Sequence, residues 1–273
     1  MDVPADEDRD PKGEQPPPLL QHLLALDDPA TVEQVVEELG LWERPVPAPG
    51  RPHVMLNMIA TVDGRASLGG RSGALSDHAD RALFHGLRST VDAVLVGAAT
   101  LRIERYGRII PDASRRQLRQ RHGLGEEPLA CVVSGRMTIA QDIPLLAEPA
   151  ARIVVITASQ ASLPATAAHV EYVRAERDGH LDLSAAIAEL QERYGVQSVL
   201  CEGGPHLARQ LLGAGLIDEL FLSLAPMLVG GEPTGGEALR ILAGDELAPP
   251  PALELRSVLQ SGSELFLRYG VCA

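Results

Sequence analysis

The chain has 273 residues, of which 45% are hydrophobic and 22% charged, and its formal net charge at pH 7 is -13. This length and apolar content allow one large domain or two small ones with a sizeable core. An acidic surface repels phosphate backbones and anionic lipids, so we expect no nucleic-acid or membrane partner and favour a small-molecule substrate.

Cysteine and lysine usage exclude further classes of site. Cys131, Cys201 and Cys272 lie in apolar surroundings without the paired spacing of a zinc site or a redox dithiol, so we expect all three to be buried and no metal to be bound. Lys12 is the single lysine, which argues against a lysine Schiff base. No run reaches about 18 apolar residues and no basic-apolar leader is present, so we expect a soluble, cytoplasmic protein.

The first 50 residues differ in composition from the rest. They hold 12 acidic and 3 basic side chains, which account for most of the net charge. Residues 1–18, rich in acidic residues and proline, have too little apolar surface to offset the entropy lost on ordering, so we expect a disordered tail. Residues 19–50 are expected to form a short helical extension and a linker. Asp27 or Asp28 can cap the helix, and Gly40 ends it.

Residues 51–273 alternate between short β-rich runs and amphipathic helices. The runs are "HVMLNMIA", "DAVLVG", "LACVVS", "RIVVIT", "HVEYVR" and "SVLCEGG", with helices expected over 77–90 and 182–194. This alternation predicts a three-layer αβα domain, in which helices cover both faces of a mixed, mainly parallel sheet. The last runs, "ELFLSLAPMLVGG", "ALELRSVLQ" and "ELFLRYGV", break the alternation, and "SGS" between the final two indicates antiparallel edge strands.

The stretch "SVLCEGGPHLARQLL", residues 198–212, predicts a junction between a strand and a helix, where ligands of such sheets bind. Gly203 and Gly204 let the backbone approach a ligand, Pro205 suits the first helical turn, and free N–H groups there can hold a phosphate. The charge of Glu202 opposes an adjacent phosphate, so this carboxylate better suits a ring N–H or a hydroxyl. The alternative is a tight turn with a surface glutamate.

Three other junctions have similar features. "DAVLVGAATLR" places Gly97 before Thr100, which can cap a helix or bond a phosphate oxygen. In "CVVSGRM", Ser134 and Arg136 suit a terminal phosphate, although a solvent-facing arginine explains the same residues. "MIATVDGRASLGGRSG" predicts a turn at Asp63-Gly64, followed by a mobile flap or a simple hairpin. Together the four junctions favour a dinucleotide, although neither a three-glycine Rossmann fingerprint nor a P-loop occurs.

In this order, "TVDG", "LRSTVDAVLVGAAT" and "CEGGP" resemble the "SLDG", "LR…DAILVGxGT" and "EGG" motifs of the reductase domain of the riboflavin-biosynthesis deaminase-reductase. That family is related to dihydrofolate reductase, and the likeness covers about residues 53–270. The resemblance implies a dihydrofolate reductase-like fold over residues 51–273, NADPH as cofactor, and a homodimer. It also implies reduction of 5-amino-6-(5-phosphoribosylamino)uracil to the ribitylamino product.

The same resemblance implies roles for individual residues. Cofactor contacts carried over from the motifs are Thr61, Asp63, Gly97, Thr100, Gly203, Gly204 and Pro205, with Ser134 and Arg136 as the clamp on the 2′-phosphate. Substrate contacts are Asn57, Ser72, Arg88, Glu104 and Glu202. Because hydride transfer belongs to the nicotinamide, few catalytic side chains are needed, and Glu104, or water held by it, is the candidate proton donor.

The chain departs from the family pattern at two places. Asn57 stands where a lysine is usual, and Glu104-Arg105-Tyr106 replaces "DDP". Arg102, Arg105 or Arg108 can supply the charge absent at Asn57. The zinc-deaminase motifs H-x-E and P-C-x-x-C do not occur, so no deaminase activity is expected of this chain. Reduction of a pterin and a non-catalytic nucleotide-binding role stay open as alternatives, whereas a hydrolase lacks its G-x-S-x-G elbow.

Overall fold

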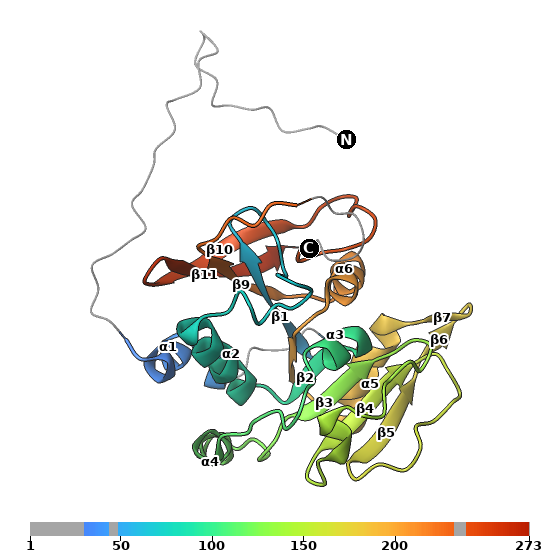
Figure 1. The fold of residues 1–273 in the computed structure, drawn as a ribbon. Helices are drawn as coiled ribbons and strands as arrows, with labels where there is room; N and C mark the ends of the chain where they lie inside the picture. Colours follow the sequence, from blue (N-terminus) through green and yellow to red (C-terminus); the bar gives the residue numbers. More distant parts are fainter. Residues whose placement is uncertain (1–29, 44–48, 232–238, 273) are drawn as a thin grey trace, which may run out of the picture.

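A computed structural model describes residues 30–43, 49–231 and 239–272 (Figure 1). The strands are β1 (His53–Thr61), β2 (Ala93–Gly97), β3 (Leu129–Val133), β4 (Arg152–Thr157), β5 (His169–Arg174), β6 (Glu176–Arg177), β7 (His180–Leu181), β8 (Ser198–Cys201), β9 (Glu219–Ala225), β10 (Ala252–Ser261) and β11 (Glu264–Cys272). The helices are α1 (Val32–Glu38), η1 (Leu41–Glu43), α2 (His78–Thr90), α3 (Ala98–Ile103), α4 (Ala113–Arg121), η2 (Pro144–Ala147), α5 (Leu183–Tyr194) and α6 (Pro205–Gly213). The predicted strands and the helices over 77–90 and 182–194 are confirmed.

Nine strands form one sheet in the order β10-β11-β9-β1-β8-β2-β3-β4-β5. Pairing is parallel from β9 through β5, and β11 runs antiparallel to both β9 and β10. The predicted mixed, mainly parallel sheet with antiparallel C-terminal strands is therefore confirmed, although β9 itself is parallel to β1. Gly262, with φ +58°, occupies the two-residue turn between Ser261 and Glu264, a position that favours glycine.

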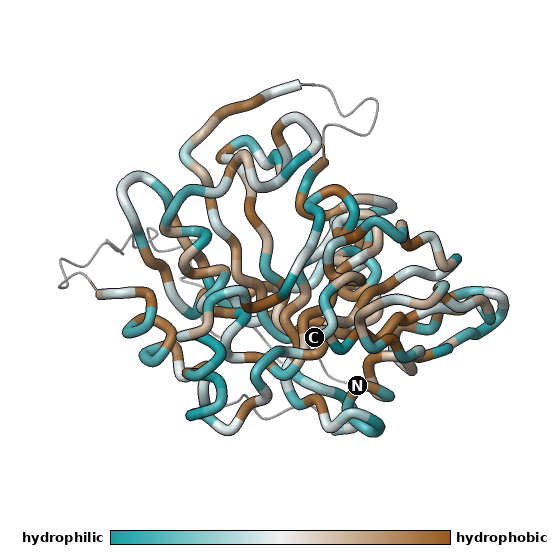
Figure 2. Tube along the Cα trace, turned by 60° about the horizontal axis from the view of Figure 1, so that its bottom comes forward, coloured by the Kyte–Doolittle hydropathy of each residue, from teal (hydrophilic) through white to brown (hydrophobic). Residues whose placement is uncertain are grey.

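Helices cover both faces of the sheet, which confirms the three-layer architecture. On one face, buried side chains of α5 and α6, such as Ile187 and Leu211, pack against strand residues such as Leu56. On the other, α2 and α3 contribute Leu87 and Leu101 to a second core. The central strands carry many of the apolar segments in Figure 2, while outer turns are largely hydrophilic. Alternate strand residues thus feed two cores, as expected for a sheet buried on both sides.

Helix α2 is fixed at both ends, and it carries residues of the site. The side chain of Asp77 caps its start by accepting from the backbone N–H of Asp80 at 2.9 Å. At its C-terminal end the guanidinium of Arg119, only 1% exposed, donates to the carbonyl oxygens of Arg88, Ser89 and Val91 at 2.7–3.2 Å. Arg119 belongs to α4, so α4 holds the last turn of α2 in place.

The N-terminal extension packs on the domain. Leu41 is 2% exposed, and the ring of Trp42 stacks on His122 at 4.0 Å. The predicted cap was wrong for α1, because Thr31, rather than Asp27 or Asp28, accepts from the N–H of Gln34 in a capping box. The predicted tail 1–18 and most of the predicted linker lie outside the described residues. Within the described part of the chain, every helix is too short or too polar to cross a membrane.

One local expectation was wrong, and one helix was not predicted. Cys131 and Cys201 are buried, but Cys272 is exposed because it is the last residue of β11. Helix α4 was not predicted, since "ASRRQLRQR" offers a single aliphatic residue beyond its first alanine and therefore no apolar periodicity.

Candidate active site

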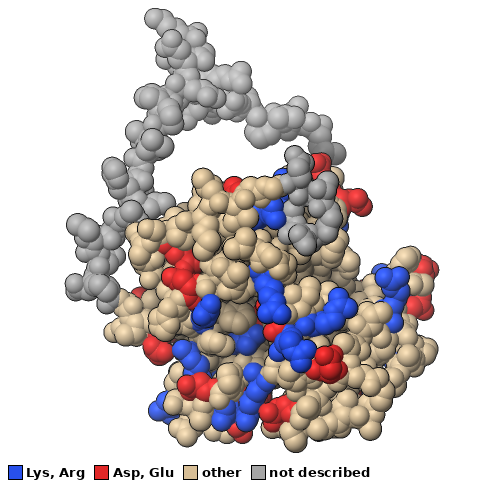
Figure 3. All heavy atoms as spheres, viewed as in Figure 1, with Lys and Arg blue, Asp and Glu red and all other residues tan. Residues whose placement is uncertain are grey.

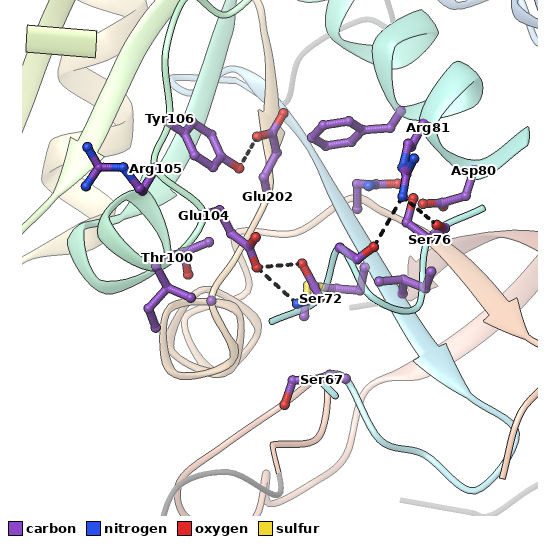
Figure 4. A pocket seen from close by; sticks show the side chains of 18 of the residues that line it. Ser67, Ser72, Ser76, Asp80, Arg81, Thr100, Glu104, Arg105, Tyr106 and Glu202 are labelled. Atoms are coloured by element: carbon purple, nitrogen blue, oxygen red, sulfur yellow. Dashed lines mark hydrogen bonds between the residues drawn. The ribbon is translucent and has the colours of Figure 1, made fainter. Parts of the chain in front are cut away.

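A cavity of about 390 Å³ opens between α2, the segment 66–76, α3 and the carboxyl end of β8 (Figure 4). Its size lies in the range of small-molecule sites. All five predicted substrate contacts line it, namely Asn57, Ser72, Arg88, Glu104 and Glu202, and so do Thr100, Gly204 and Pro205. The structure thus brings residues from five separate segments of the sequence to one cavity.

Arg88 and Glu202 form a buried ion pair in this cavity. The Nε and Nη2 atoms of Arg88 donate to the two Glu202 carboxylate oxygens at 2.6 and 2.7 Å, and Nη1 donates to the carbonyl of Ile109 at 3.2 Å. Burial favours the neutral form of Arg88, but the adjacent carboxylate outweighs it and raises the pKa, so the guanidinium stays charged. Because each guanidinium nitrogen of Arg88 and both carboxylate oxygens of Glu202 form a hydrogen bond, the ion pair is held in one geometry.

Tyr106 completes the group around Glu202, and the sequence did not identify it as a site residue. Its hydroxyl donates to Oε2 of Glu202 at 2.6 Å, as Figure 4 shows. Burial and the neighbouring carboxylate raise the pKa of Tyr106 well above 10.0, so it remains a donor. The guanidinium carbon of Arg88 also lies 4.1 Å from the Phe84 ring centre and 5.2 Å from that of Tyr106. Only the departure from "DDP" signalled that this position is special.

Glu104, the predicted proton donor, follows α3 and faces the segment that precedes α2. Its Oε1 accepts from both the N–H and the hydroxyl of Ser72, each at 3.0 Å. Among the described residues, Oε2 has no hydrogen-bond partner. Glu104 therefore ties the segment 66–76 to α3 and keeps one oxygen available at the cavity (Figure 4).

The predicted glycine junctions lie side by side, because β2 and β8 are adjacent parallel strands. The N–H of Gly97 donates to the carbonyl of Gly203 at 2.8 Å. A Cβ on Gly204 would lie 2.7 Å from Oγ1 of Thr100, and Gly203 has φ +84°. A side chain is therefore strained at Gly203 and crowded at Gly204.

Helix α6 begins at Pro205, as predicted, and Gly204 is its cap. Gly97, rather than Thr100, caps α3, so the capping role suggested for Thr100 was wrong. Thr100 lies inside the first turn, with its hydroxyl near Gly204. The N–H groups at the starts of α3 and α6 lie next to the cavity, at positions where the chain has only small residues.

Ser134 and Arg136 follow β3, the next strand beyond β2. Ser134 is 5% exposed, and its hydroxyl accepts from the N–H of Thr138 at 2.8 Å. Arg136 is exposed, and no carboxylate of the described residues forms an ion pair with it. The pair thus lies at the same edge of the sheet as the two glycine junctions, on the side away from β1.

Thr61 and Asp63 lie at the end of β1 and hold a turn. The Thr61 hydroxyl bonds the Asp63 carboxylate and accepts from the N–H of Arg65, while Asp63 accepts from the N–H of Gly230 at 2.6 Å. The Thr61 hydroxyl and the Gly230 amide lower the pKa of Asp63. The turn predicted at Asp63-Gly64 is confirmed, with Gly64 at φ +83°. Their contact with a cofactor stays a prediction.

Basic side chains gather around a hollow on the face seen in Figure 3. Because Lys12 is the single lysine and lies outside the described residues, this charge is arginine. Arg81, Arg88, Arg105 and Arg108 line the cavity. A chain of net charge -13 thus places four arginines, beside Asp80, Glu104 and Glu202, around this cavity, and arginine suits an anionic ligand. Within the described ranges, no group of three or more His, Cys, Asp or Glu side chains is arranged to hold a metal ion.

The family model for the RibD C-terminal domain matches residues 52–267. The chain belongs to this family. It is 29% identical over 229 residues to the 2,5-diamino-6-ribosylamino-4(3H)-pyrimidinone 5′-phosphate reductase of Methanothermobacter thermautotrophicus, covering 81% of this chain and 99% of that protein. It is 26% identical over 227 residues to the riboflavin biosynthesis protein RibD of Escherichia coli, covering 80% of this chain and 59% of that longer protein.

A solved structure has a similar fold. The pyrimidine reductase-like protein of Corynebacterium diphtheriae superposes with a TM-score of 0.70 at 25% identity, covering 89% of this chain and 100% of the other. The predicted membership in the family is confirmed, and the relatives named above are a pyrimidinone 5′-phosphate reductase and a riboflavin biosynthesis protein.

Proposed function

We propose that the chain is an NADPH-dependent reductase of a pyrimidine ribosylamine 5′-phosphate, converting the ribosyl group to a ribityl group. The observation that carries this proposal is the adjacency of two features. The glycine junctions at Gly97 and at Gly203-Gly204 bond each other and lie beside a cavity that contains Arg88, Glu104 and Glu202. One groove can therefore hold a dinucleotide next to a polar, anionic substrate.

The residues present fit a nicotinamide dinucleotide. A Cβ at Gly204 would crowd the Thr100 hydroxyl, and its absence leaves the start of α6 open to a phosphate that binds the first N–H groups of that helix. Ser134 and Arg136, two strands away, supply a hydroxyl and a free guanidinium for a 2′-phosphate, which favours NADPH over NADH. When bound, the cofactor supplies hydride to C1′ of the ring-opened sugar.

The protein's own task is to hold the substrate and to place a proton. Reduction of a C1′=N bond requires hydride at carbon and a proton at nitrogen. Glu104 has one carboxyl oxygen fixed by Ser72 and the other available at the cavity, so it, or water bonded to it, is the proposed proton donor. Glu202, held by Arg88 and Tyr106, offers its remaining acceptor capacity to N–H groups of the pyrimidine.

Two substrates differ only at ring position 2. The family resemblance implies the uracil form, with an oxygen there, whereas the Methanothermobacter relative is named for the diamino form. Mixing purified protein with NADPH and each compound in turn, and following loss of reduced-nicotinamide absorbance, tests the function. Oxidation with at least one compound is expected, and none with dihydrofolate. Binding of NADPH without turnover of either compound would instead support a non-catalytic nucleotide-binding role.

A further inference from the structure

The two substrates considered above differ at ring position 2, and the cavity contains a carboxylate that the proposed function leaves unused. Asp80 lies in the first turn of α2 and lines the cavity (Figure 4). It is 8% exposed, and its Oδ1 accepts from the hydroxyl of Ser223 on β9 at 2.6 Å. Among the described residues, Oδ2 has no hydrogen-bond partner and the carboxylate forms no ion pair. A carboxylate buried to this degree needs further hydrogen-bond donors.

The helix dipole does not account for this burial. A carboxylate in the first turn of a helix is stabilised by the dipole at an exposed position too, without the cost of desolvation. The side chain of Asp77 already caps α2, and the neighbouring Arg81 donates to two backbone carbonyls at 3.1 and 3.5 Å instead of to Asp80. The carboxyl group of Glu264 lies near both aspartates. This end of the cavity therefore attracts N–H donors and repels carbonyl oxygens.

The other carboxylates of the cavity have less acceptor capacity left. Oε2 of Glu202 accepts from both Arg88 and Tyr106, and Oε1 accepts from Arg88, so one acceptor position remains, on Oε1. Glu104 accepts twice at Oε1, which leaves only Oε2. Asp80 keeps a position on Oδ1 and both positions on Oδ2. Of the three, it is the carboxylate that can take two neighbouring N–H groups, one on each oxygen.

We propose that Asp80 binds the 2-amino group and the adjacent N3–H of a 2-amino-4-oxopyrimidine ring, so that the chain prefers the diamino substrate to the uracil form. These two N–H groups lie side by side and match the two oxygens of a carboxylate. In the uracil form position 2 carries an oxygen, so the same carboxylate meets one N–H and one repelling carbonyl. This preference rests on the proposed function and selects between its two substrates.

Initial rates with NADPH give kcat/KM for the diamino and the uracil compounds. Wild type is expected to prefer the diamino form by at least about tenfold, because a hydrogen bond to a charged group is gained and a repulsion is avoided. Asp80→Asn keeps the shape of the side chain but presents one N–H donor and one carbonyl, which match the uracil edge. It should lower the diamino-to-uracil ratio by at least about tenfold or reverse it.

Asp77→Asn is the matched control for this variant. It neutralises the neighbouring carboxylate, which does not line the cavity, and asparagine keeps the helix cap, so the ratio should stay at its wild-type value. A purely structural role of Asp80 would change kcat/KM for both compounds alike and leave their ratio unaltered.

A second measurement does not depend on turnover. NMR titration with 2-amino-4-pyrimidinone and with uracil should show the same preference in wild type and its loss in Asp80→Asn. If neither ribosylamine is reduced yet this dependence holds, or if dihydrofolate, a pterin with the same ring edge, is reduced instead, the proposed function fails and the role of Asp80 stands. If a ribosylamine is reduced and wild type treats both forms alike or favours the uracil form, or if Asp80→Asn keeps the wild-type ratio, the assignment of Asp80 is overturned.

Discussion

Glu264 begins β11 and is 2% exposed, and neither of its carboxyl oxygens has a hydrogen-bond donor among the described residues. Its neighbours are the carboxyl groups of Asp77 and Asp80. Burial, followed by the contact with Asp77, raises the pKa of Glu264 from 4.5 to about 8. The folded protein therefore carries a proton on Glu264 at neutral pH that the unfolded chain has released.

The direction of the pH dependence follows from this difference. The folded state keeps the proton up to about pH 8, whereas the unfolded state loses it near 4.5, so unfolding releases a proton in that window. The free energy of unfolding should fall by about 1.4 kcal/mol for each pH unit between these values. At pH 7 the accumulated loss is at most about 3 kcal/mol.

The Glu264→Gln variant should remove this loss, because an amide donates to Asp77 without ionising. We expect its unfolding free energy to match wild type at pH 4 and to exceed it by up to about 3 kcal/mol at pH 7. Urea denaturation from pH 4 to pH 9 measures both, with Glu254→Gln, an exposed carboxylate on β10, as the control. Equal pH slopes in wild type and Glu264→Gln, or a less stable variant at pH 7, would refute the reasoning.

Three further predictions concern the site. Tyr106→Phe removes a 2.6 Å hydrogen bond to the Glu202 carboxylate. It should raise KM for the pyrimidine substrate about tenfold in steady-state kinetics and leave the NADPH dissociation constant, measured by fluorescence titration, unchanged. A higher NADPH dissociation constant with an unchanged KM would place Tyr106 on the cofactor side. Gly204→Ala brings a Cβ to 2.7 Å from the Thr100 hydroxyl and should weaken NADPH binding. Adding Thr100→Ala should partly restore that binding. If Gly204→Ala alone has no effect, the cofactor does not approach Gly204 closely. Arg136→Ala should raise KM for NADPH by about tenfold and leave KM for NADH unchanged, since only NADPH carries the 2′-phosphate; equal effects on both cofactors would remove the proposed clamp.

Much of the fold was predictable because the apolar runs of the strands and the helical spacing of apolar residues are both clear in this sequence. The apolar strands and the amphipathic helices after residues 77 and 182 follow directly from the spacing of their side chains. The position of β8 between β1 and β2 was not predictable, because strand order depends on packing among segments far apart in the chain. Helix α4 was missed because its buried residue is an arginine, which no apolar pattern marks.

The site was predictable as a set of residues but not as a set of contacts. Gly97, Gly203 and Gly204 were identified because each follows a predicted parallel strand. These glycines lie side by side because β2 pairs with β8. Arg88 and Glu202 were each interpreted as substrate contacts, yet they bond each other across 114 positions of sequence. The sequence carries no signal for that pair, because charge complementarity between distant residues appears only when the sheet and α2 are assembled. The predicted homodimer stays a prediction.

The buried guanidinium of Arg119 connects α4 with the end of α2, two helices that are separate in the sequence. It holds three carbonyls near the end of α2 and, through Nε, the carbonyl of Gly125 at 2.9 Å. One of those three carbonyls belongs to Arg88 itself. Helix α4, which is polar and lies at the surface, therefore fixes the position of the Arg88–Glu202 ion pair in the cavity. Substitutions in α4 can change substrate binding although no residue of α4 touches the ligand.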